Sequence, residues 1–426
     1  MKPTRVRWII FALACAASWL LYLHRYAWGA IKPEFRAENP GLDDVAIGWL
    51  DSAFQASYAL GQVPLGMAGD RIGPRIMLTA ATLLGSLSVA GVAFVSGFWP
   101  LAMARAGFGL AQAGIYPVLN KMTRTWFSLV TRTTVQGAVT ALGRIGAACA
   151  PVIILMFLMG IVGLSWQTTL VSLLLPGVLL TVGFWLVVRD SPREHPWVNQ
   201  AERVEIEGLP SPAAPLPKGE GGKTGLQLRG AALLSLIMML VYAFASTFQD
   251  QFYVYWLTSF LREGRGFDIT QTGLFSSLPF LGGALGGVLG GMLNDVLLRH
   301  WGNRRWTRSL VAIAGKTIAA GLVLLSVQMA DGRAALLILV AARIFGDWSL
   351  PTQWAAVTDM GGRASATLFG LVNAVGAAGG FAANPIYGYL KQHYDWPGIF
   401  AGVATMCLLA AATWLFLDCT KKVVED

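Results

Sequence analysis

The chain has 426 residues, of which 55% are hydrophobic and 13% are charged, and its formal net charge is +9. Soluble domains carry roughly 25% charged residues, so this composition excludes an ordinary soluble protein and favours one solvated by lipid. The positive charge does not indicate nucleic-acid binding, because the basic residues mostly flank long apolar runs.

Apolar runs long enough to cross a bilayer recur along the whole chain. About 20 apolar residues span the hydrocarbon core as a helix. The sequence therefore predicts an all-α membrane protein with twelve transmembrane helices. The predicted spans are 8–31, 45–67, 76–96, 99–120, 133–158, 166–188, 232–261, 271–294, 309–329, 334–355, 366–389 and 397–417.

A polar segment, 189–231, interrupts this pattern between the sixth and seventh spans. It is rich in proline, glycine and charged residues, which is typical of a flexible linker. We therefore predict an N-terminal six-helix half (1–188) and a C-terminal six-helix half (232–426).

The distribution of lysine and arginine predicts the orientation. With the N-terminus inside, 21 of the 32 basic residues lie on the cytoplasmic side, six lie outside and five fall within the spans. Basic residues prefer cytoplasmic loops, so both termini and the linker are expected to be cytoplasmic. The six outside are Lys32, Arg36, Arg262, Arg265, Arg333 and Lys391.

A short charged turn occurs twice, after the second span and after the eighth. The copies are Gly66-Met-Ala-Gly-Asp70-Arg71-Ile-Gly73-Pro-Arg75 and Gly291-Met-Leu-Asn-Asp295-Val-Leu-Leu-Arg299, 225 residues apart. Spans 4 and 10, and spans 5 and 11, also share glycine, arginine and proline positions at offsets of up to 239. Two such halves resemble the major facilitator superfamily, whose parallel repeats enclose a central site.

This turn is interpreted as a cytoplasmic gate. The Asp70 carboxylate lies where it can meet the positive end of the third helix and pair with an arginine. Such pairs would form when the cytoplasmic end closes and break when it opens. The gate residues are Gly66, Asp70, Arg71, Gly73, Arg75, Asp295 and Arg299.

Charged residues inside the spans point to the cargo. A charge at the bilayer centre costs at least about 2.5 kcal/mol and faces a partner or a wet cavity. Five cations (Arg25, Arg105, Arg144, Lys316 and Arg343) outnumber three anions (Asp51, Asp250 and Asp347). We expect an anionic substrate to supply the missing charge. The alternative for each cation is a structural partner, and Arg343 and Asp347, spaced i, i+4, can satisfy one another.

Further stretches resemble the anion:cation symporter family, which includes galactonate and hexuronate transporters and sialin. They are Tyr22-Leu-His-Arg25, Ser52 to Tyr58, Arg105 to Pro117, Ser191 to Asn199, Trp354-x4-Asp359 and Asn373. The resemblance implies that Arg25 binds a substrate carboxylate through paired hydrogen bonds. It places Tyr22, Tyr58, Arg105, Tyr255, Trp354 and Asn373 in the same pocket. Arg144 is a further cation that would recognise a second anionic group or a more acidic substrate.

Two departures from that family bear on energy coupling. Its proton symporters have aspartate before the first-span arginine and glutamate in the fourth span, where this chain has His24 and Gln112. Glutamine does not titrate, so His24 is the first candidate proton carrier, followed by Asp347 and Asp250. Uniport and anion exchange without protons stay open as alternatives.

No motif for hydrolysis, redox chemistry, nucleotide binding or metal ligation occurs in the sequence. We therefore expect no enzyme activity, cofactor or metal, and a monomeric secondary transporter of a small organic anion, such as a sugar acid, in the plasma (inner) membrane. Other hypotheses are export of cationic or neutral compounds, and a membrane sensor that binds an anion without moving it.

Overall fold

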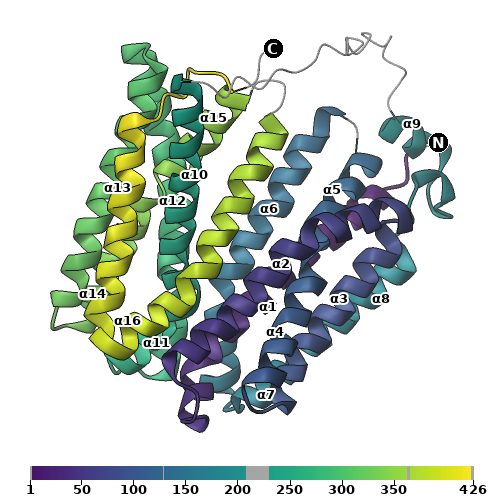
Figure 1. The fold of residues 1–426 in the computed structure, drawn as a ribbon. Helices are drawn as coiled ribbons and strands as arrows, with labels where there is room; N and C mark the ends of the chain where they lie inside the picture. Colours follow the sequence, from purple (N-terminus) through teal and green to yellow (C-terminus); the bar gives the residue numbers. More distant parts are fainter. Residues whose placement is uncertain (1, 128, 208–229, 362–364, 424–426) are drawn as a thin grey trace. The chain divides into compact units, whose positions relative to one another are not determined.

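The computed structural model describes residues 2–127, 129–207, 230–361 and 365–423, apart from the side chains of residues 70, 124, 129–134 and 365–367. All regular elements within these residues are helical, as predicted (Figure 1). The chain forms two compact units. Unit 1 is Met1–Ile31 with Ala53–Glu220, and unit 2 is Lys32–Ser52 with Gly221–Asp426.

Unit 1 contains most of the predicted N-terminal half. Its first two helices cross the unit boundary, because their adjoining ends belong to unit 2. The elements are α1 (Val6–Glu38), α2 (Asp44–Ile72), α3 (Pro74–Gly91), η1 (Val92–Phe94), α4 (Phe98–Ala113), α5 (Ile115–Trp126), α6 (Leu129–Pro151), η2 (Val152–Ile161), α7 (Trp166–Ser172), α8 (Leu174–Val187), η3 (Pro192–Glu194) and α9 (Gln200–Glu207).

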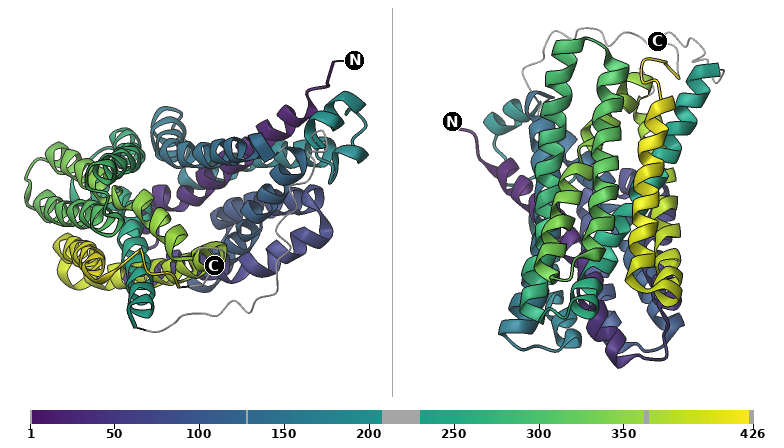
Figure 2. Two further views of the ribbon diagram at one scale, coloured as in Figure 1. Left: turned by 90° about the horizontal axis from the view of Figure 1, so that it is seen from above. Right: turned by 90° about the vertical axis from the view of Figure 1, so that its left-hand side faces the viewer.

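Unit 2 contains the remaining helices, which run side by side in Figure 2, coloured teal to yellow. They are α10 (Gly230–Gln251), η4 (Phe252–Trp256), α11 (Leu257–Ser259), η5 (Phe260–Gly264), α12 (Ile269–Trp301), α13 (Arg304–Gln328), α14 (Gly332–Gly346), α15 (Ser349–Gly361) and α16 (Ser365–Phe416). Asp395, with φ 54°, breaks the helical geometry of α16 and divides it into two spans. The elements together account for the twelve predicted spans.

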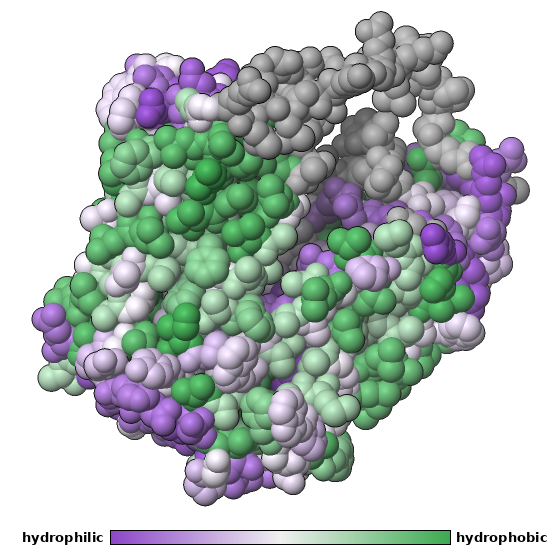
Figure 3. Space-filling model, in the orientation of Figure 1, coloured by the Kyte–Doolittle hydropathy of each residue, from purple (hydrophilic) through white to green (hydrophobic). Residues whose placement is uncertain are grey.

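Nine stretches of the described chain meet strict criteria of length and apolarity for a membrane span. The number is below twelve because both spans of α16 fall within the single stretch Leu368–Phe416, and because α2 and the α4–α5 pair are not among the nine. On the visible face of unit 2, hydrophobic side chains form a broad area between polar ends (Figure 3). A surface of this kind suits contact with lipid.

Side-chain caps explain where several helices of unit 2 begin. The Asp268 carboxylate accepts a hydrogen bond from the Gln271 backbone N–H at the start of α12. Asn303 and Asp331 cap α13 and α14 in the same way. At the other end of α12, Gly302 adopts a left-handed conformation with φ 65°, which glycine tolerates at a helix C-terminus.

The structure differs from the sequence expectation in two places. Helix α1 continues to Glu38, so Lys32, expected outside the membrane, lies within this helix and is buried. The start of the predicted flexible linker is also folded, since η3 and α9 lie within it. The rest of that linker, residues 208–229, lies outside the described part of the chain.

Candidate functional site

Arg25 on α1 is surrounded by aromatic rings in unit 1. Its guanidinium carbon lies 4.6 Å from the ring centre of Tyr58, 5.1 Å from that of Tyr22 and 5.2 Å from that of Phe54. Cation–π contacts of this kind hold a guanidinium group in place without neutralising its charge. The two predicted tyrosines therefore do meet Arg25, and Phe54 joins them.

Arg105 on α4 contacts the same aromatic cluster. Its guanidinium carbon lies 5.3 Å from the Phe54 ring and 5.2 Å from the Trp28 ring, and only 2% of the residue is exposed. Phe54 thus contacts both guanidinium groups. The structure places Arg25 and Arg105 around Phe54, a residue that the sequence did not single out.

Close packing of α4 against α2 sets this arrangement. A Cβ atom added to Gly109 would lie 2.0 Å from the Ser57 hydroxyl and 2.5 Å from the Phe54 carbonyl oxygen. Only glycine allows the two backbones to approach this closely. Gly109 therefore fixes how Phe54 lies relative to Arg105, which is one helical turn away on the same helix.

Gln112, also on α4, is the polar neighbour of Arg25. The Arg25 Nε–H donates to the Gln112 side-chain oxygen at 3.2 Å, and the Gln112 amide donates to the Leu21 carbonyl at 2.9 Å. Both ends of the amide are thus used, and the side chain is buried. Proton symporters of the anion:cation symporter family, which this chain resembles, have a carboxylate at the position of Gln112, whereas the side chain here is neutral.

Tyr22 links this cluster to α6. The Tyr22 ring stands edge-on to Tyr116 at 6.3 Å, and the Tyr116 hydroxyl is 2.8 Å from that of Ser18. A Cβ atom at Gly143 would lie within 2.8 Å of all three side chains, so α6 packs tightly here. Arg144, the next residue, is exposed.

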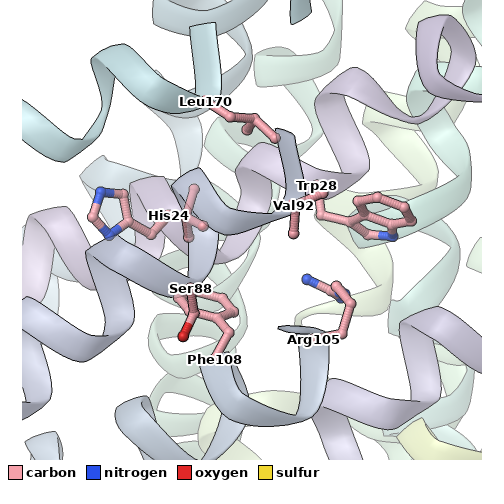
Figure 4. A pocket seen from close by; sticks show the side chains of 8 residues that line it. His24, Trp28, Ser88, Val92, Arg105, Phe108 and Leu170 are labelled. Carbon is pink, nitrogen blue, oxygen red and sulfur yellow. The ribbon is translucent and has the colours of Figure 1, made fainter. Parts of the chain in front are cut away.

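His24 lies in the interior of unit 1. It is 4% exposed, and its Nε2 atom is 3.2 Å from the Leu173 carbonyl oxygen. It lines a cavity of about 10 Å³, room for roughly one water molecule, together with Trp28, Arg105 and Phe108. In Figure 4 the Arg105 guanidinium points into the space between the labelled side chains, and the imidazole lies on the opposite side.

The predicted carboxylate carriers both contact Arg343 in unit 2. The Arg343 guanidinium pairs with Asp250 and, at 3.2 Å, with Asp347, which confirms the predicted i, i+4 ion pair. It also lies 5.0 Å from the Tyr253 ring. Nearby, the Lys316 ammonium donates to the Ser246 hydroxyl at 3.0 Å.

The other predicted pocket residues of unit 2 have separate surroundings. Trp354 is 45% exposed and stands edge-on to Phe369, and Asn373 is exposed. Tyr255 is buried, with its ring centre 5.9 Å from the Lys32 ammonium.

Lys32 forms a deeply buried ion pair with Asp51 in unit 2. Its ammonium lies 2.8 Å from the Asp51 carboxylate and 4.1 Å from the Trp256 ring centre, and both side chains are at most 2% exposed. Asp51, counted above among the membrane anions, therefore has a cation of its own.

The predicted gate loop is stabilised by Asp190, which follows the sixth span. The Asp190 carboxylate accepts the Arg75 backbone N–H at 3.0 Å, and a Cβ atom at Gly73 would lie 2.5 Å from it. Gly73 also has φ 94°, a conformation that favours glycine. The motif glycine is thus required both by backbone geometry and by space.

The remaining gate residues show fewer contacts. Gly66 packs against Pro117, whose side chain would lie 3.5 Å from an added Cβ atom. Arg71, Asp295 and Arg299 are exposed. The Asp70 side chain lies outside the described part of the structure.

Sequence reasoning missed Phe54, Trp28 and Asp190. Phe54 and Tyr58 are spaced i, i+4, and Trp28 lies three residues after Arg25, so each falls on the helix face of a predicted site residue. That spacing could have identified Phe54 and Trp28 from the sequence. No such spacing pointed to Asp190, because it is 115 residues from Arg75 in sequence. Among the described residues, no group of three metal-ligating side chains occurs.

Comparison with known proteins adds to this geometry. The sequence profile described as "Major Facilitator Superfamily" matches residues 8–384. The chain is 25% identical to the probable sulfoacetate transporter of Cupriavidus necator, covering 93% of this chain and 91% of the relative. It is 28% identical to the probable galactarate/D-glucarate transporter of Bacillus subtilis, covering 98% and 92%.

Solved structures agree on the fold. A D-xylose-proton symporter superposes with a TM-score of 0.73 at 14% identity, covering 97% of this chain and 98% of the other. A bacterial homologue of the lysosomal transporter Spinster gives a TM-score of 0.72 at 16% identity, covering 98% and 95%. At these identities the likeness concerns the fold alone.

Proposed function

This chain belongs to the Major Facilitator Superfamily, and we propose that it moves a small organic anion across a membrane by alternating access. As a member of a transporter family it is an integral multi-pass membrane protein and not an enzyme. We further propose a monomer in the plasma (inner) membrane, with both termini cytoplasmic.

The observation that carries the proposal is the pair of arginines around Phe54. Arg25 and Arg105 come from two different helices and both contact one aromatic ring. A guanidinium group matches a carboxylate through two parallel, charge-assisted hydrogen bonds. In our proposal these two side chains hold the carboxylate, and Tyr22 and Tyr58 form its aromatic surround.

The substrate class that fits best is a sugar acid or a similar small carboxylate. Relatives named for sulfoacetate, galactarate/D-glucarate and D-galactonate match over more than 90% of this chain, and all of these compounds are small anions.

Two modes of energy coupling are distinguished. In the first, His24 carries a proton with the anion. In the second, transport is uncoupled or exchanges anions. The neutral Gln112 beside Arg25 and the hydrogen bond between His24 and the Leu173 carbonyl support the second. An uptake experiment with a pH indicator inside liposomes separates them, since only proton symport acidifies the lumen in a His24-dependent way.

The proposal is tested by ligand binding to the purified protein. A thermal-shift screen of sugar acids, dicarboxylates and sulfonates should find an anion that raises the unfolding temperature. Arg25→Gln should then weaken its binding roughly 100-fold, because charge-assisted hydrogen bonds contribute about 1.5–3 kcal/mol each. Undiminished affinity in this variant would contradict the proposed site.

A further inference from the structure

Unit 1 carries three cations within its predicted spans, Arg25, Arg105 and Arg144. Residues 1–31 and 71–188 contain no aspartate or glutamate, and 53–70 contain only Asp70. Asp70 is two residues from the end of α2. One carboxylate on Arg25 and Arg105 would leave Arg144 as a further positive charge within its span.

Arg144 lies deep within its span. The span runs from Val135 to Ile161, so nine residues, about 13 Å of helix, separate Arg144 from one end. Seventeen residues, about 25 Å, separate it from the other. At that depth a charged side chain faces water or a partner and not lipid.

The exposed face around Arg144 fits a water-filled route. Gly137, Thr140, Ala141 and Arg144 are all exposed, and their i, i+3, i+4, i+7 spacing puts them on one face of α6. Lipid-facing stripes consist of large apolar side chains. This stripe is small and polar, so the Arg144 guanidinium lies on a surface that a solute can reach.

Arg144 also lies close to the proposed carboxylate site. The backbone of Gly143, the preceding residue, packs against the Tyr22 ring, and that ring lies 5.1 Å from the Arg25 guanidinium carbon. Helices packed this closely have axes about 8–10 Å apart. Arg25 therefore contacts Tyr22 from its own helix α1, and Arg144 follows the glycine that packs against Tyr22 from α6. A small solute with charges at both ends can bridge two helices at this separation.

We infer that the substrate carries two anionic groups, and that Arg144 binds the second of them. This inference rests on the proposed function. It narrows the substrate class from small organic anions to dianions, such as a dicarboxylate or a carboxylate with a sulfonate. Arg144 then acts as the residue that selects dianions over monoanions.

The experiment measures binding of matched pairs of solutes by titration calorimetry. The pairs are glucarate with gluconate, and sulfoacetate with acetate, so each dianion is compared with a related monoanion. The wild-type protein should bind at least one dianion roughly 10- to 100-fold more tightly than the related monoanion. This ratio is the gain in affinity expected from one additional charge-assisted contact.

Arg144→Gln should remove that preference, lowering affinity for the dianion while changing affinity for the monoanion less than twofold. Arg144→Lys, which keeps the charge, should retain part of the preference. Arg333→Gln removes one exposed positive charge outside the proposed site and should change neither affinity. Thermal unfolding of each variant confirms that it is folded.

Two results would contradict the inference about Arg144 and leave the proposed function intact. One is Arg144→Gln weakening both members of a pair equally or leaving both unchanged. The other is a wild-type protein that binds a monoanion as tightly as its dianionic partner, in an Arg25-dependent way. If none of the four anions binds, the proposed function fails together with this inference.

Discussion

At the residue scale, the feature that bears most on anion binding is that Arg25 is hydrogen-bonded to a neutral side chain, Gln112. The Gln112 amide is hydrogen-bonded at both ends and holds the guanidinium group without cancelling its charge. A carboxylate at this position would form an ion pair with Arg25 and compete with an incoming anion. Its protonation would release Arg25, which would link anion binding to pH.

The substitution Gln112→Glu tests this reasoning. We expect it to weaken anion binding at neutral pH by at least about tenfold, the effect of one charge-assisted contact, and to restore binding as the pH falls and the glutamate is protonated. Titration calorimetry between pH 5 and 8 measures this. Gln249→Glu is a matched control, since Gln249 is also buried, at 4% exposure against 2% for Gln112, but lies in unit 2, where it accepts a hydrogen bond from Cys407.

The sequence pointed to the charged residues of the candidate site but not to all of their neighbours. Arg25 and Arg105 stand out because a charge in an apolar run is costly. Phe54 does not stand out, since aromatic residues are common in such runs. Its role depends on the rotation of α2 against α4, which one helix's sequence does not fix.

At the element scale, close helix contacts set the geometry of the site. Gly109→Ala would push Ser57 and the Phe54 backbone away from α4. We expect a loss of about 1–3 kcal/mol of stability from overpacking, together with weaker anion binding through the displaced Phe54. Gly107→Ala is the control on the same helix, because its nearest neighbour would be an ordinary 3.7 Å away. Equal behaviour of the two variants would contradict this account.

The folded start of the linker is held onto unit 1 by polar contacts. The buried Glu202 of α9 accepts hydrogen bonds from the Val6 and Arg7 backbone N–H groups at 3.2 and 3.0 Å, and so caps α1. His195 lies close by, between Trp126 and Trp197. Its Nδ1 accepts the Trp197 backbone N–H and its Nε2 is 2.8 Å from the Val187 carbonyl oxygen, which requires the neutral ring.

This environment makes stability depend on pH. Burial lowers the pKa of His195 below its ordinary value of 6.5, so the folded state disfavours the protonated ring. The stabilisation is complete above pH 6.5 and is lost as the pH falls from there toward the lowered pKa. The unfolding temperature should therefore fall between pH 7 and 5, and less so in His195→Gln. His300→Gln, at an exposed histidine, should leave the pH dependence unchanged.

The sequence predicted most elements because each membrane-spanning helix requires a long run of apolar residues. It did not predict that α1 continues past Lys32 or that α9 folds onto unit 1. In both cases the residues are polar, and their order comes from partners far away in the chain. Lys32 is ordered by Asp51 and Trp256, and α9 by the N-terminus of α1.

At the scale of the whole molecule, the buried charges divide into two groups. Lys32 pairs with Asp51, and Arg343 pairs with Asp250 and Asp347, so every anion predicted inside the membrane contacts a cation in unit 2. The other predicted cations are Arg25, Arg105 and Arg144 in unit 1, and Lys316 in unit 2, which donates to the Ser246 hydroxyl. This division supports the proposal that unit 1 supplies most of the anion site.

The Lys32–Asp51 pair should matter for stability more than any surface pair. Lys32→Met removes the lysine cation from beside the buried Asp51 carboxylate and should cost about 3–5 kcal/mol, measured by denaturant unfolding in detergent. Lys32→Met with Asp51→Leu should recover most of that loss. Lys391→Met disrupts the ion pair with the exposed Asp395 and should cost at most about 1 kcal/mol.

The central claim is that Arg25 and Arg105 hold an anion that the protein carries across the membrane. Uptake of radiolabelled glucarate, galactonate and sulfoacetate into liposomes containing the purified protein tests it most directly. We predict saturable uptake of at least one of these anions, inhibited by excess unlabelled anion and abolished by Arg25→Gln or Arg105→Gln, with normal uptake in Arg333→Gln. Uptake that persists in both arginine variants, or no uptake of any anion by the folded wild-type protein, would contradict the claim.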